Sequence, residues 1–145
     1  MTKPSTKPST TPFGQDIGVA SAAGRRILLA LLAKDQLDFP EWLTLTTVNN
    51  EGPRSRDALE ARLTGGLLLE DADAIARLES RGALREESGA IELTGAGQAL
   101  YDRLALAVRD IGGQLLDGVS PDDVATTRRV LRTYTERAAA RAELG

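Results

Sequence analysis

The stretch from residue 55 to residue 97 constrains the fold of this chain more than any other part. It reads SRDALEARL, TGGLLL, EDADAIARLESRGAL and REESGAIELTGAG. Its apolar spacing predicts a helix, a turn, a second helix that ends at Gly82, a tight hairpin and the start of another helix. This order predicts a helix–turn–helix followed by a two-stranded wing, a module whose second helix usually enters the major groove of DNA.

Short-range signals define the limits of these elements. Ser55 is predicted to cap the first helix, Glu70 or Asp71 the second, and the turn lies at Thr64-Gly65-Gly66. The strands are expected at residues 83–85 and 91–93, where Leu84, Ile91 and Leu93 alternate with polar residues. The predicted inward-facing residues of the two helices and the turn are Leu59, Leu63, Leu67, Leu68, Leu69, Ala74, Ile75 and Leu78.

Further helices are predicted on both sides of this module. The first runs from Phe13 to Ala33, and the second begins at Asp38, where Pro40 and Glu41 complete a capping box. Thr94 is expected to cap a long helix that ends near Leu116, and Ser120-Pro121-Asp122-Asp123 to begin the last one.

The predicted fold is mainly α with a small β-hairpin wing, a winged helix–turn–helix with N- and C-terminal dimerisation helices. A chain of 145 residues is long enough for one domain with its own core. We expect a disordered Pro/Ser/Thr/Lys tail at residues 1–12 and a single domain at 13–145. Within it, the winged lobe covers about residues 38–95, and the dimerisation helices about 14–33 and 96–141.

The last predicted helix carries an apolar seam that its own chain does not require. Val124, Leu131, Tyr134 and Ala138 follow one another at heptad-like spacing. We expect this seam to pair with the first helix of a second subunit; the alternative is the solvated face of a monomer. The predicted interface residues are Phe13, Ile17, Leu131 and Tyr134.

The composition excludes several classes of function. The absence of Cys excludes disulfides, thiol catalysis and thiol-based peroxide sensing, and the absence of His removes imidazole chemistry and histidine-ligated metal sites. The Gly65-Gly66 and Gly112-Gly113 pairs lack the context of a phosphate-binding loop. We therefore predict no enzyme activity, no metal site and no cofactor.

The chain also lacks targeting signals. No apolar run approaches the roughly 20 residues that a membrane span needs, and no signal peptide is visible. We expect a cytoplasmic protein that does not contact a membrane. Its Arg- and Ala-rich, Lys-poor composition indicates a bacterial source with a GC-rich genome.

Four phrases in this order resemble the MarR (multiple antibiotic resistance regulator) family of winged-helix transcription regulators. They are LDFPEWLTL, ARLESRGALR, IELTGAGQALYDRL and LLDGVSPDDVATTRRVLRTYTERA, and the likeness covers about residues 13–141. The resemblance implies a homodimer built from the terminal helices, a pseudo-palindromic double-stranded DNA operator, and a small, often aromatic effector. Trp42 would then border the effector pocket, although a tryptophan at this spacing also suits a core anchor.

On this resemblance, the expected DNA contacts are Arg54, Ser55, Arg56, Arg77, Arg81 and Arg85. The charge of the module departs from the family pattern. The sequence from Arg54 to Arg85 contains six arginines and six acidic residues, so its formal net charge is zero, and the tip of the wing is acidic. Glu70, Asp71 and Asp73 would cap the recognition helix, but they also lie where DNA must approach. The alternative is a winged-helix module whose acidic recognition helix binds a basic protein instead of DNA.

Overall fold

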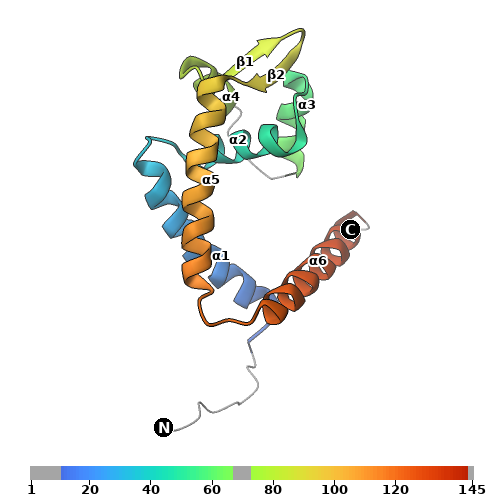
Figure 1. The fold of residues 1–145 in the computed structure, drawn as a ribbon. Helices are drawn as coiled ribbons and strands as arrows, with labels where there is room; N and C mark the ends of the chain where they lie inside the picture. Colours follow the sequence, from blue (N-terminus) through green and yellow to red (C-terminus); the bar gives the residue numbers. More distant parts are fainter. Residues whose placement is uncertain (1–10, 67–72, 144–145) are drawn as a thin grey trace. The chain divides into compact units, whose positions relative to one another are not determined.

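The structure, a computed structural model, describes residues 11–66 and 73–143 (Figure 1). The chain divides into two compact units, Met1–Val108 and Arg109–Gly145. The elements are α1 (Phe13–Ala33), α2 (Phe39–Glu51), α3 (Arg56–Ala61), the π-helical turn η1 (Arg62–Gly66), α4 (Ala74–Ser80), β1 (Leu84–Glu87), β2 (Ala90–Leu93), α5 (Gly95–Leu115) and α6 (Pro121–Glu143). The predicted class, mainly α with a hairpin wing, is confirmed.

The N-caps predicted from the sequence are confirmed at four helices. The Asp38 carboxylate accepts from the N–H three residues on at 2.8 Å, within a complete capping box. The Ser55, Thr94 and Ser120 hydroxyls accept in the same way at 3.0–3.1 Å. Each cap satisfies a backbone donor that has no partner inside the helix, and thereby fixes where the helix begins.

The connection between α3 and α4 differs from the expected turn. Residues 62–66 continue α3 as a wider π-helical turn, in which the Thr64 hydroxyl donates to the Glu60 carbonyl at 2.8 Å. The expected caps Glu70 and Asp71, and the expected burial of Leu67, Leu68 and Leu69, lie outside the described residues. Gly82, at φ 77°, ends α4 in the left-handed conformation, as predicted.

The wing is a two-stranded antiparallel hairpin. Leu84 pairs with Leu93 and Glu87 with Ala90. The loop between them is Ser88-Gly89, and both residues have positive φ, which suits a tight two-residue hairpin turn. The strands therefore include Glu86, Glu87 and Ala90, which the sequence placed in the loop.

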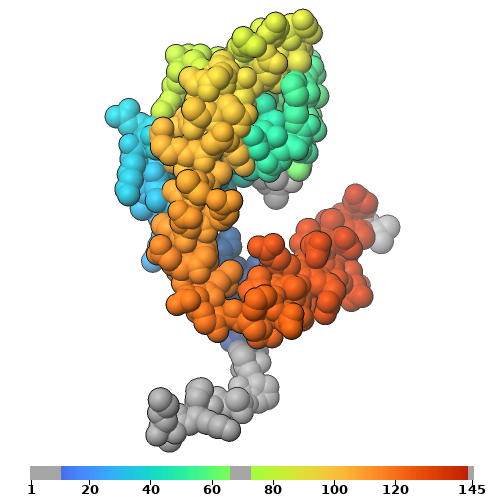
Figure 2. Space-filling model, viewed as in Figure 1, coloured from blue at the N-terminus to red at the C-terminus, as the bar shows by residue number. Residues whose placement is uncertain are grey.

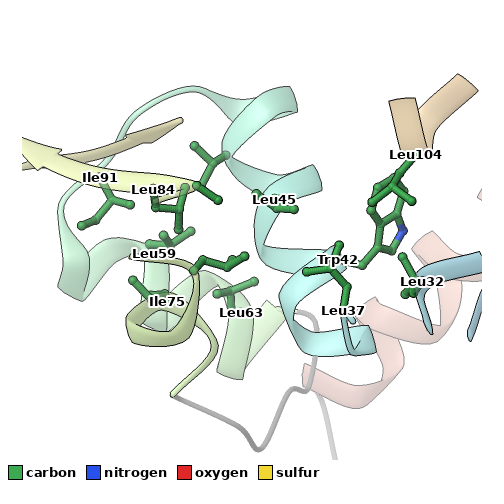
Figure 3. Packing of buried hydrophobic residues seen from close by; sticks show 13 residues of the cluster. Leu32, Leu37, Trp42, Leu45, Leu59, Leu63, Ile75, Leu84, Ile91 and Leu104 are labelled. Carbon is green, nitrogen blue, oxygen red and sulfur yellow. The ribbon is translucent and has the colours of Figure 1, made fainter. Parts of the chain in front are cut away.

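One hydrophobic cluster joins α1, α2, α3, α4, the wing and the first half of α5 (Figure 3). Its buried side chains come from both the helices and the wing. Leu84 and Ile91 lie on the face of the hairpin that packs against the apolar faces of the helices. The Trp42 ring is 9% exposed and stacks on Tyr101 of α5, with 5.5 Å between ring centroids. The cluster contains Leu32, Leu37, Trp42, Leu45, Val48, Leu59, Leu63, Ile75, Leu78, Ala83, Leu84, Ile91 and Leu104.

A buried carboxylate links α2 to α4. Glu41 is 5% exposed, and its side chain lies 3.6 Å from the Arg81 guanidinium and 3.9 Å from that of Arg77. Burial raises the pKa of Glu41, and the nearby Asp38 charge adds to this, while the hydrogen bond from the Asp38 backbone and the two arginines lower it. The net rise means that the loss of hydration exceeds what these partners restore.

The start of α5 is locked to the end of α4 by a close backbone approach. The Thr94 N–H donates to the Ala83 carbonyl at 3.0 Å, and the Thr94 hydroxyl donates to the Gly82 carbonyl. A Cβ at Gly97 would lie 1.9 Å from the Ala83 carbonyl oxygen. Only glycine allows this contact, so residue 97 sets how near α5 approaches the base of the wing.

Replacing Gly97 with alanine is expected to lower the free energy of unfolding by about 1–3 kcal/mol or more, because the clash is with backbone and cannot be relieved by a side-chain rotation. Urea denaturation measures the change. Gly95→Ala is the matched control: a Cβ there meets nothing within 4 Å, so this variant should be as stable as the wild type or slightly more stable. Equal stability of the two variants would contradict the close approach.

The raised pKa of Glu41 predicts a pH dependence of stability. The folded protein binds the proton more tightly than the unfolded chain, so this contribution is fully present below pH 4.5 and is lost as the pH rises through the raised pKa. We expect Glu41→Gln to lack this component and to gain stability relative to the wild type as the pH rises through that window. Denaturation curves at a series of pH values measure the difference, and parallel profiles would contradict it.

Candidate nucleic-acid interface

Three of the predicted DNA contacts gather around the wing. The Arg54 carbonyl accepts from the Ile91 N–H at 2.8 Å, which attaches the segment before α3 to β2. This bridge places Arg54 and Arg56 beside the hairpin that carries Arg85. Figure 2 shows the wing, in yellow, next to α3, in green, on the surface of this lobe.

Arg56 extends from the first turn of α3 to two other elements. Its Nη2 lies 2.6 Å from the Glu79 carboxylate on α4 and 3.4 Å from the Glu86 carboxylate on β1. The hydrogen bond to Glu79 is the main reason why the pKa of Arg56 is raised. The guanidinium side chain is 35% exposed, so it is accessible to solvent while it is paired.

Arg85 is paired within the wing. It lies 2.7 Å from Glu92 on the opposite strand and 3.0 Å from Glu87 on its own strand. The bond to Glu92 raises the pKa of Arg85 and lowers that of the Glu92 carboxyl. Since residues 85 and 92 are direct partners in the hairpin register, this pair could have been found from the predicted strands.

Arg77 and Arg81 lie apart from the wing group and have partners near the α1–α2 connection. Arg77 pairs with Asp38 at 2.9 Å, and Arg81 donates to the carbonyls of Asp35 and Gln36 at 2.6 and 2.8 Å. These bonds tie α4 to the start of α2. The family resemblance made these two residues of the predicted recognition helix candidate DNA contacts together with the wing arginines. Positions 77 and 81 share a helix face that Glu79 does not.

All six arginines of the winged lobe, residues 38–95, have a carboxylate within 4.0 Å. Arg54 and Arg62 share Glu51, at 3.5 and 3.0 Å. The lobe holds six arginines and twelve acids, a formal net charge of −6. A phosphate at this surface would therefore meet cations that are already paired. The balance of six arginines and six acids over residues 54–85 left out the acids of α2 and the wing, which form several of these pairs.

The remaining predicted residues have mixed surroundings. Ser55 uses its hydroxyl as the cap of α3. Asp73 stands at the N-cap position of α4 with a helical backbone, whereas Glu70 and Asp71 lie outside the described residues. Trp42 belongs to the core, as the core-anchor alternative had it, and its predicted role in an effector pocket stays a prediction.

The predicted interface residues are largely exposed within their own units. Phe13 is 48% exposed on α1, whose side chains up to residue 26 are exposed with the exception of the half-buried Ile17. On α6, Leu131 is 38% and Tyr134 44% exposed, and no residue of this 23-residue helix is buried.

The described residues offer neither a candidate metal site nor a helix that could cross a membrane. They contain no group of three or more His, Cys, Asp or Glu side chains that could hold a metal ion. Among these same residues, no helix is long and apolar enough to cross a membrane.

Comparison with known proteins gives a consistent result at the level of structure. No family model and no curated protein matches the sequence. Reduced MarR of E. coli is 20% identical, with a TM-score of 0.69 over 87% of this chain and 95% of that one. A MarR-family protein of Bacillus stearothermophilus is 16% identical, with a TM-score of 0.71 over 87% and 92%.

A third similar structure is a MarR-family protein of Mycobacterium tuberculosis in complex with p-aminosalicylic acid. It is 21% identical, with a TM-score of 0.70 over 86% of this chain and 99% of that one. The matches cover 92–99% of the length of these three chains. The resemblance seen in the sequence is thus confirmed for the fold: this chain has the winged-helix fold of the MarR-family regulators.

Proposed function

We propose that this protein is a dimeric transcription regulator that binds double-stranded operator DNA through its winged lobe. The observation that carries the proposal is the match of 87% of this chain to MarR-family structures, with TM-scores of 0.69 and 0.71. In this proposal α4 enters the major groove, and Arg54, Arg56 and Arg85 contact phosphates beside the wing. Arg77 and Arg81 contribute by holding α4 in place.

The dimer is proposed from the exposure of the terminal helices. A helix of 23 residues without a buried side chain gains little stability from its own chain, since packing of an apolar face supplies most helix stability. Val130, Leu131 and Tyr134 form such a face on α6, and each is at least 38% exposed. A second copy that covers α6 and α1 would bury it, and it would pair two lobes for two operator half-sites.

An effector is proposed from the ligands of the relatives. Two structures of the Mycobacterium protein are complexes with p-aminosalicylic acid and salicylic acid, which are small aromatic acids. The Trp42 ring is packed against Tyr101, so a ligand beside it would have to displace core contacts. A pocket of about 400 Å3 that is open to solvent is lined by Arg77 and Arg81 but also by Glu41 and Asp73. A carboxylate ligand there would have to compete with the carboxylates that already pair with the two guanidinium groups.

A second function is favoured by the charge of the lobe. With a formal net charge of −6 and every arginine paired, the lobe is complementary to a basic protein surface. In that case the module would bind a protein and not DNA. Binding that persists after nuclease treatment, together with no affinity for duplex DNA at any salt concentration, would favour this function.

The proposed dimer predicts that Leu131→Glu shifts the protein toward monomer, because the change places a charge in the apolar seam of α6. Light scattering after size exclusion measures the mass in solution. Ala125→Glu is the matched control: it adds the same charge to the same helix, on the side opposite Tyr134 (about 180° around the helix), and it should leave the dimer intact. A monomeric wild type at working concentrations would contradict the proposal.

The proposed DNA contact predicts that the wild type retards a duplex that carries the region upstream of its own coding sequence, and that its affinity falls steeply with salt. Arg56→Ala should weaken binding and reduce the salt slope by about one phosphate contact. Arg129→Ala, which removes the same charge from α6, should change affinity less. No retardation by the wild type at low salt would count against DNA binding.

A further inference from the structure

One cation beside the wing is held by two carboxylates that lie on two elements distant in the sequence. Arg56 Nη2 lies 2.6 Å from Glu79 of α4 and 3.4 Å from Glu86 of β1. These three residues are separated by 23 and 30 positions in the sequence, so only the folded lobe brings them together. Their side chains are 35%, 27% and 47% exposed, which leaves the cluster open to an incoming anion.

A carboxylate and a phosphate each bind a guanidinium group by accepting hydrogen bonds from its N–H groups through anionic oxygens. Glu79 and Glu86 therefore both bind Nη2, one of the nitrogens that a DNA phosphate would use. An exposed ion pair contributes little free energy, so a phosphate can displace it, but each displacement reduces the gain from the new contact. Sequence-independent binding depends almost entirely on such phosphate contacts, so it loses more from this competition than base recognition does.

We propose that Glu79 and Glu86 act as an internal counter-anion that competes with DNA phosphate for Arg56 and thereby lowers the affinity of the lobe for non-operator DNA. This inference rests on the proposed DNA-binding function. It makes the two glutamates specificity-determining residues, although neither has to touch a base. On the wing, Glu87 and Glu92 would compete with phosphate for Arg85 in the same way.

The test is a double-mutant cycle on the full-length protein. The four proteins are the wild type, Glu79→Gln/Glu86→Gln, Arg56→Ala, and the triple variant that combines these changes. Their affinities for a fluorescein-labelled duplex of random sequence, about three helical turns long, are measured by anisotropy at low and moderate salt. Binding to the duplex from the protein's own upstream region is measured in parallel.

We expect the two glutamine substitutions to tighten binding of the random duplex about threefold to tenfold at low salt when Arg56 is present. In the Arg56→Ala background the same substitutions should change affinity by less than about twofold. The matched control is Asp57→Asn/Glu60→Gln, which removes two charges from α3; neither carboxylate forms an ion pair among the residues that the structure describes. This control should give a smaller gain, and that gain should not depend on Arg56.

Three other outcomes separate the two proposals. A gain equal to that of the control, or one that persists without Arg56, overturns the competition and leaves the DNA-binding function intact. If no protein in the cycle binds either duplex, the DNA-binding function fails and the competition fails with it. Should the double glutamine variant unfold, as circular dichroism would show, Glu86→Gln alone replaces it in the cycle, since Glu86 is the more exposed carboxylate.

Discussion

Burial of α2 on most of its sides forces its polar side chains to find partners inside the protein. The Thr44 and Thr47 hydroxyls each donate at 2.8 Å to the carbonyl one turn earlier in the helix. Glu41 receives its partners from the N-cap and from α4. Only Thr46 Oγ1 is buried without a hydrogen-bond partner among the described residues of this helix. The positions of α1, α4, β2 and α5 follow from this helix, since each packs against it or against its tryptophan.

The arginines of the lobe connect elements that are distant in the chain. Arg77 and Arg81 hold α4 to the α1–α2 connection, and Arg56 holds α3 to α4 and β1. The two groups of arginines differ in how readily another ligand can replace their carboxylate partners. The carboxylate opposite Arg81 is almost fully buried, and removing one member of a buried pair leaves a charge without compensation. The carboxylates opposite Arg56 are partly exposed, so water or phosphate can take their place at small cost. The buried Glu41 thus provides a fixed partner for the cations that position α4, while the exchangeable pairs lie beside the wing.

The sequence predicts the elements of this fold well because their limits are marked locally. Asp38, Ser55, Thr94 and Ser120 act within three residues of themselves, and Gly82 ends its helix through its own backbone conformation. The π-helical form of η1 escaped prediction because no spacing rule distinguishes it from a turn at two glycines.

The candidate site is less predictable because it consists of contacts between elements. Nothing in the spacing of Arg56, Glu79 and Glu86 shows that they meet, since their distances depend on how α3, α4 and the wing pack. Arg85 and Glu92 are the exception, because the hairpin register alone places them opposite each other. Glycine 97 is intermediate: a helix start was evident there, but the carbonyl that excludes a side chain belongs to a residue fourteen positions earlier.

The aromatic pair between α2 and α5 has a practical consequence. Trp42 is the chain's one indole, and its ring lies against Tyr101 in a nearly dry environment. Indole emission shifts to longer wavelength when water reaches the ring, so the emission of Trp42 reports on the packing around this one side chain, which includes the contact between α2 and the first half of α5. An event that loosens this junction can therefore be followed optically without a label, and one that leaves it closed will not be seen at that wavelength.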